Sequence, residues 1–102
     1  MRIINRKEFL NLTPPVIYSK VNCGCVVIGM YVATQFIEND WFFKSLNPQL
    51  SNTSTNFETC ILDFDALERD GSFDDEDIVE FLIFENDDIQ GLINELRNYS
   101  NT

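Results

Sequence analysis

The chain has 102 residues, of which 44% are hydrophobic and 13% aromatic, and its formal net charge is −10. This length predicts a single domain over residues 1–102 that can bury a core without staples, and the apolar content excludes a disordered acidic tail. Residues 25–33, the longest apolar stretch, fall short of the ~20 residues that span a bilayer. Because Glu8 interrupts the region where a signal peptide is apolar, we also expect a cytoplasmic protein.

Residues 5–13 carry the signals of a short N-terminal helix. Asn5 can cap the first turn, and Glu8 follows three residues later as in a capping box. Pro14 and Pro15 cannot continue a helix, because neither has a backbone N–H to donate. The sequence therefore predicts a helix that begins at Asn5 and ends before these prolines.

The next stretch has the composition of strands. Residues 16–21 and 25–37 are rich in β-branched and aromatic side chains, which favour strands, and the turn-like residues 22–24 between them predict a hairpin. Residues 38–40 form a second turn signal. Residues 41–46 then form either a third strand or a helical turn, and their aromatic side chains indicate a place in the core.

The middle of the chain changes character twice. Residues 48–56 are polar and uncharged, which is typical of a surface loop. From 59 to 65 apolar residues alternate with others, so this segment predicts a strand. Its outward face would carry Asp63 and Asp65.

The last part of the chain predicts a turn at 70–72, a strand at 78–85 and a C-terminal helix. The strand is apolar on both faces, which indicates the interior of a sheet. Asn86 or Asp87 can cap the helix, and Gly91 weakens it unless it allows close packing. The helix carries an apolar stripe with helical spacing: Ile89, Leu92, Ile93 and Leu96.

The order of the elements predicts the fold class. Short links between the strands leave no room for crossover helices, so the sheet is mainly antiparallel. The sequence predicts an α+β protein, a two-layer sandwich in which a sheet of four to five strands carries the N-terminal and the C-terminal helix on one face.

Charge is unevenly distributed along the chain. Five basic against three acidic residues give residues 1–57 a net charge of +2, whereas thirteen acidic residues against Arg69 give residues 58–88 a net charge of −12. Glu95 and Arg97 cancel in the remainder. Such a field repels nucleic acid and anionic membranes, so we expect neither as a direct partner. It attracts basic surfaces, although a negative surface can also serve solubility alone.

The acidic turn resembles a calcium-binding loop only in part. With Gly71 at the sixth position of an EF-hand loop, residues 66–77 place oxygen-bearing side chains at the third, fifth, seventh and ninth positions. Ala66 then occupies the first position, where aspartate is nearly indispensable, and Asp77 replaces the bidentate glutamate at the last. We therefore expect no metal site here and no cofactor.

The sequence offers no catalytic constellation. The chain has no histidine, no glycine-rich phosphate loop and no cysteine beside an activating partner. Its three cysteines would lack a fourth zinc ligand, and we interpret them as reduced thiols. We expect a non-enzymatic protein.

Three segments resemble a group of short acidic proteins encoded by tailed bacteriophages and prophages. The segments are INRKEFLNL with VIYSK at 4–20, NDWFFKSL at 39–46 and RDGSFDDEDIVEFLIFENDDIQGLI at 69–93. The group shares an NRxEFL-type helix, a DxFF-type segment and a DGxFD-type turn. The resemblance carries over no catalytic or ligand-binding residue. It implies a small protein that acts in the host cytoplasm by binding a host protein.

Two functional hypotheses follow. In the first, the protein is an acidic binding protein or inhibitor that presents its carboxylates to a basic surface of a host protein, including nucleic-acid-binding surfaces, as a DNA mimic. The contacting residues would be Asp63, Asp65, Asp70, Asp74, Asp75 and Glu76. In the alternative, the protein is a structural or self-assembling homo-oligomer, and its acidic surface confers only solubility.

Overall fold

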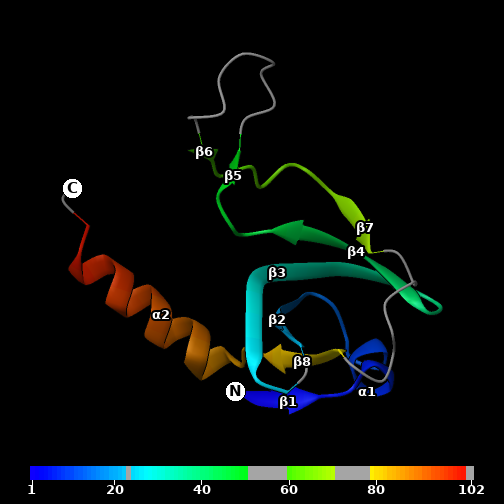
Figure 1. Ribbon diagram of the computed structural model, residues 1–102. Coiled ribbons are helices and arrows are strands. Elements are labelled where there is room, and N and C mark those ends of the chain that lie inside the picture. Colours follow the sequence, from blue (N-terminus) through cyan, green and yellow to red (C-terminus); the bar gives the residue numbers. More distant parts are fainter. Residues whose placement is uncertain (23, 51–59, 71–78, 101–102) are drawn as a thin grey trace.

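The structure, a computed structural model, describes residues 1–22, 24–50, 60–70 and 79–100. Its elements are β1 (Arg2–Ile4), α1 (Arg6–Leu10), β2 (Val16–Asn22), β3 (Val26–Ile37), β4 (Asp40–Ser45), β5 (Gln49–Leu50), β6 (Cys60–Ile61), β7 (Glu68–Asp70), β8 (Val79–Ile83) and α2 (Asn86–Asn98). The main sheet is antiparallel, with strand order β1-β8-β2-β3-β4-β7, and β5 pairs with β6 (Figure 1). The predicted α+β class is confirmed, with six strands in the sheet instead of four or five.

The two additional strands are short and lie at the ends of the sheet. β1 pairs with β8, and β7 pairs with β4. Each has three residues, too few for an alternating pattern to be recognised in the sequence. The longer strands agree with the predictions: β2 and β3 form the hairpin, and β8 lies inside the sheet between β1 and β2.

Gly29 allows β3 to change direction. Its φ of 68° lies in the left-handed region, and a Cβ at this position would collide with the ring of Tyr31. The pairing of β2 with β3 shifts register close by, between Tyr18 and Lys20. Figure 1 shows β3 turning a sharp corner, which curls the sheet around its core.

The core is a cluster of aromatic rings around Phe9 of α1. Phe9 is fully buried; its ring stacks on Phe81 with centroids 4.2 Å apart and meets Tyr18 and Trp41 edge to face. Trp41 Nε1 donates a hydrogen bond of 2.8 Å to the hydroxyl of Tyr18. The expected core position of residue 41 is therefore confirmed, and β4 is a strand.

The short helix α1 carries Phe9 into this core. Asn5 caps it, since the backbone N–H of Glu8 donates to Asn5 Oδ1 at 2.9 Å. The helix ends at Leu10, four residues before Pro14. One and a half turns of helix are thus enough to place the central aromatic ring.

Helix α2 is present as predicted, but it leaves the body of the molecule. None of its residues is buried, and Figure 1 shows it extending away from the sheet instead of lying over one face. Its cap is Glu85, where Asn86 or Asp87 was expected: Glu85 and Asp88 each accept a hydrogen bond from the backbone N–H of the other. A Cβ on Gly91 would meet no described neighbour within 4 Å, so close packing there is not observed.

Candidate functional site

The predicted acidic contact residues divide into two groups. Asp63 and Asp65 lie in the connection between β6 and β7, and Asp70 is the last residue of β7. Asp74, Asp75 and Glu76 lie outside the described residues, and so do Gly71 and Ser72 of the turn predicted at 70–72. The part of the site that can be described is therefore the segment 62–70, which we call the β7 edge.

The strand predicted for residues 59–65 is wrong over most of its length. β6 ends at Ile61, and the chain then turns at Asp63, whose Oδ1 accepts hydrogen bonds from the backbone N–H groups of Asp65 and Ala66 at 3.1 and 3.3 Å. An aspartate that bonds its own backbone competes with the ladder of a sheet. Asp63 is therefore a turn residue, and it is half-buried instead of standing on an open strand face.

Apolar side chains on the β7 edge are exposed together with its carboxylates. Leu62, Phe64 and Leu67 have relative exposures of 57%, 50% and 54%. Asp65 and Glu68 beside them are exposed as well. Leu62 and Phe64, which the strand predicted for residues 59–65 placed on its apolar face, thus share the surface with the acids.

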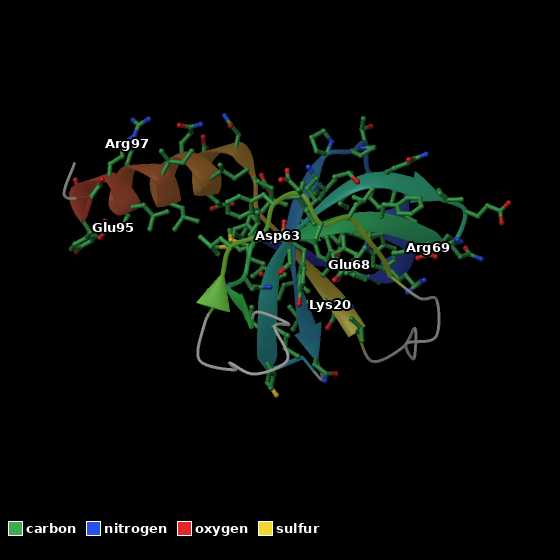
Figure 2. The ribbon with its side chains drawn as sticks, turned by 90° about the horizontal axis from the view of Figure 1, so that it is seen from above. Lys20, Asp63, Glu68, Arg69, Glu95 and Arg97 are labelled. Carbon is green, nitrogen blue, oxygen red and sulfur yellow. The ribbon has the colours of Figure 1, made fainter. Side chains whose placement is uncertain are left out.

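β7 is the terminal strand on one side of the main sheet. It is the last strand in the sheet order and pairs only with β4 among the described strands, with Phe43 opposite Glu68 and Trp41 opposite Asp70. Figure 2, seen from above, shows Asp63, Glu68 and Arg69 in succession along this segment. The β7 edge is therefore an accessible strip beside a firmly packed strand.

The single basic residue of the acidic region is already paired. Arg69 Nε donates to Asp40 Oδ2, while Asp40 Oδ1 accepts from the backbone N–H of Trp41 at 2.8 Å. The Arg69 guanidinium also lies 6.0 Å from the centre of the Phe42 ring. Asp40 neutralises the charge of Arg69. Arg69 therefore does not offset the negative charge of Asp65 and Glu68.

The Asp40–Arg69 pair was missed by sequence reasoning. Its members are 29 residues apart, and only the pairing of β4 with β7 brings them together. The one available signal was that Arg69 is isolated among thirteen acids in residues 58–88. That signal indicates that Arg69 has a carboxylate partner but not which one.

A polar hollow of about 420 Å³ lies apart from the β7 edge, between α1 and the turn that joins β3 to β4. Arg6 is buried there, donates to the backbone carbonyl of Asn39 and places its Cζ 5.0 Å from the centre of the Trp41 ring. Lys7 and Glu38 line the same hollow, so it is mixed in charge. These contacts give Arg6 a structural role, holding the helix against the turn.

Two further properties concern metals and membranes. Among residues 1–22, 24–50, 60–70 and 79–100, no group of three or more metal-ligating side chains is close enough to hold an ion. Within the same residues, no helix combines the length and the apolar character required to cross a bilayer.

Comparisons with known proteins found no matching family model, no matching curated protein and no matching solved structure.

Proposed function

We propose that the protein is a small, non-enzymatic, acidic binding protein that engages a basic surface of another protein through the β7 edge and the acidic turn that follows it. The observation that carries this proposal is the joint exposure of Leu62, Phe64 and Leu67 with Asp65 and Glu68. A surface that served solubility alone would gain nothing from exposing three large apolar side chains.

The two kinds of side chain have different roles in binding. The carboxylates attract a basic surface over a distance and can raise the association rate by about ten- to a thousandfold at low salt. The apolar side chains act after contact, when their burial slows dissociation. The β7 edge therefore has what a fast and selective complex with a basic protein requires.

Nucleic-acid-binding proteins are the partner class that fits best. Their working surfaces carry Lys and Arg spaced to meet phosphates, and the carboxylates Asp65, Glu68, Asp70, Asp74, Asp75 and Glu76 can occupy such a surface in place of a nucleic acid. The resemblance to phage proteins supports the same direction, because it implies a host protein as target. The protein would then act as an inhibitor in the host cytoplasm.

The test uses the intact chain and two sets of neutralised variants. One set carries Asp65→Asn with Glu68→Gln, and the other carries Asp74→Asn, Asp75→Asn and Glu76→Gln. Host proteins captured from bacterial lysate at low salt should be released at high salt, competed away by double-stranded DNA and lost in both sets of variants. Capture that is insensitive to salt and to these substitutions would contradict the proposal.

Self-assembly is a second candidate, favoured by the open sides of the sheet. β1 and β7 are the terminal strands of the described sheet, and Ile3 on β1 is 54% exposed. If copies pair through these strands, light scattering will give a multiple of the chain mass that the neutralised variants do not change. A monomer mass at micromolar concentration would exclude this candidate.

A further inference from the structure

The hydrogen bonds of β4 determine which backbone groups of β7 are free to bind another molecule. Leu46, directly after β4, donates its backbone N–H to the carbonyl of Met30 in β3 at 2.8 Å. Backbone groups along a strand point alternately to its two sides. The even-numbered residues of β4 therefore face β3, and the odd-numbered residues Trp41 and Phe43 face β7.

Arg69 directs its backbone N–H and C=O away from the sheet. Trp41 pairs with Asp70 and Phe43 pairs with Glu68, so the backbone groups of Asp70 and Glu68 point toward β4. Arg69 lies between these two residues, and its backbone groups point to the opposite side. Among the described residues no strand lies on that side of β7. An extended segment of another molecule can therefore continue the ladder there.

The charge beside this open side of β7 is negative. Residues 62–70 include four acidic residues and Arg69, whose charge Asp40 already balances. Asp65 and Glu68 are exposed, and neither forms an ion pair with a described residue. Lys44 follows the part of β4 that pairs with β7, and it offsets one charge at most. A segment that pairs with β7 is therefore favoured when it carries lysine or arginine.

The side chains of β7 alternate in character, and this alternation determines the pattern of a matching segment. Leu67, directly before β7, and Arg69 lie on one face, and Glu68 lies on the other. Leu67 is 54% exposed, so a neighbouring apolar residue would cover it. A residue beside Glu68 meets a carboxylate instead. The matching segment therefore alternates apolar with basic side chains.

β1, the other terminal strand of the sheet, does not attract a basic segment in this way. The Met1 amine beside it lies 2.8 Å from Asp88 Oδ2, and Arg2 Nε lies 3.6 Å from Glu85 Oε1. The charges beside β1 are thus balanced within the chain. A basic segment therefore distinguishes β7 from β1.

A second copy of the chain fits the open side of β7 poorly. Pairing β7 with β7 of another copy brings Asp65 and Glu68 of both copies together. Pairing β7 with β1 of another copy offers Arg2 as the only basic residue of that strand, and Arg2 already pairs with Glu85. Neither arrangement supplies free basic side chains.

We infer that the protein binds an extended basic segment of its partner by adding it to the main sheet as an antiparallel strand beside β7. In this segment lysine or arginine alternates with apolar residues, as a flexible basic tail can provide. The inference rests on the proposed function, because it names the part of the basic partner that the β7 edge binds.

The test uses a short synthetic peptide in which valine alternates with lysine, and two N-methylated forms of it. In the antiparallel ladder the valines lie beside Leu67 and Arg69 and direct their N–H groups toward β7, whereas the lysines direct theirs away. Methylation of the valine nitrogens should therefore raise Kd by at least about tenfold in isothermal titration calorimetry. Methylation of the lysine nitrogens is the matched control and should leave Kd nearly unchanged.

Two measurements on the intact chain locate the bound peptide. Glu68→Gln should weaken the unmodified peptide by about two- to fivefold, and Glu95→Gln, which removes a charge from α2, should not. At a free peptide concentration of about ten times Kd, hydrogen exchange of the Arg69 amide should slow about tenfold.

Ile3 of β1 is the control amide for the exchange measurement. Phe84 donates its N–H to Ile17 of β2 at 3.0 Å, so by the same alternation the backbone groups of Leu82 face β2. Ile3 is opposite Leu82, and its own backbone groups therefore point outward from β1. Its exchange rate should stay the same when the peptide binds.

Three outcomes would overturn the inference: no binding of the unmodified peptide, equal effects of the two methylations, or slower exchange at Ile3 instead of Arg69. Salt-sensitive capture of host proteins that is lost in the neutralised variants would still support the proposed function in each case. The failure of the inference is thus distinguished from the failure of the proposed function.

Discussion

The aromatic core and the β7 edge contain similar side chains in opposite settings. In the core, Phe9 and Trp41 are buried. Asp40 accepts a hydrogen bond from the backbone N–H of Trp41 and pairs with Arg69. At the β7 edge, Phe64 is half exposed and Asp65 faces solvent. In the core, aromatic rings stabilise the fold by burial, and the carboxylate of Asp40 does so by pairing. The exposed side chains of the β7 edge bury less of their area, so we expect them to contribute less to the stability of the fold.

Replacing one phenylalanine in each region should give the largest contrast. Phe9→Ala removes the ring around which the core packs and should lower the free energy of unfolding by about 3–5 kcal/mol. Phe64→Ala deletes a ring that is already half in water, so its effect should stay within about 1 kcal/mol. Denaturant unfolding of the two variants measures both, and comparable losses would mean that the β7 edge belongs to the core.

Asp40→Asn should lower the stability of the fold by an intermediate amount and should also change the net charge of the β7 edge. The amide keeps the acceptor for the Trp41 N–H but loses the charge facing Arg69, whose side chain is 60% exposed. We expect a loss of about 1–2 kcal/mol in unfolding free energy. The released Arg69 would also offset part of the charge of Glu68, so association with a basic partner should slow.

Arg69→Gln separates these two consequences. It removes the same ion pair, so it should also destabilise the fold, but it makes the β7 edge more negative and should speed association. Stopped-flow association rates at low salt distinguish the variants. If both changed the rate in the same direction, Arg69 would not act through the charge of the edge.

Neutralising the exposed carboxylates should leave the fold almost unchanged. Asp65→Asn with Glu68→Gln removes two solvated charges, which should alter the free energy of unfolding by less than about 0.5 kcal/mol. The same variant should lose part of the salt dependence of binding. A clear loss of stability, measured by denaturant unfolding, would assign these carboxylates to the fold instead of to a partner.

Long periodic segments account for most of what the sequence predicted correctly. The hairpin of β2 and β3, the interior strand β8 and the apolar stripe of α2 each extend over enough residues for a period to be recognised. The strands β1 and β7 were missed because each has three residues, and their positions depend on pairing with β8 and β4. The first turn of α2 pairs with Met1 and Arg2 at the other end of the chain, contacts that no local pattern predicts.

The candidate site was predictable in composition but not in geometry. Local charge identified the acidic region, whereas the turn at Asp63 arises from side chain to backbone hydrogen bonds that an alternating pattern conceals. Leu62 and Phe64 belong to the apolar face of the predicted strand, and they are exposed because the chain turns there instead. The pairing of Arg69 with Asp40 needed the fold itself.

The smallest expected effect concerns the pH dependence of α2. The hydrogen bond that the Met1 amine donates to Asp88 raises the pKa of the amine above 8.0. The contribution of this pair to stability is therefore present below pH 8.0 and is lost as pH rises through the raised pKa. The same bond lowers the pKa of Asp88 below 3.8, so the contribution is present above that value and is lost as pH falls through the lowered pKa.

Asp88→Asn should therefore lower the melting temperature slightly between these limits and leave it unchanged beyond them. Acetylation of the Met1 amine should remove the alkaline part of this pH dependence from the chain that has Asp88. It should have no such effect in the Asp88→Asn variant, because the carboxylate that pairs with the amine is already gone. Asp87→Asn is the control, since Asp87 acts on the Met1 amine only through its charge. A pH dependence as large in the Asp88 variant as in the unmodified chain would show that it does not arise from this ion pair.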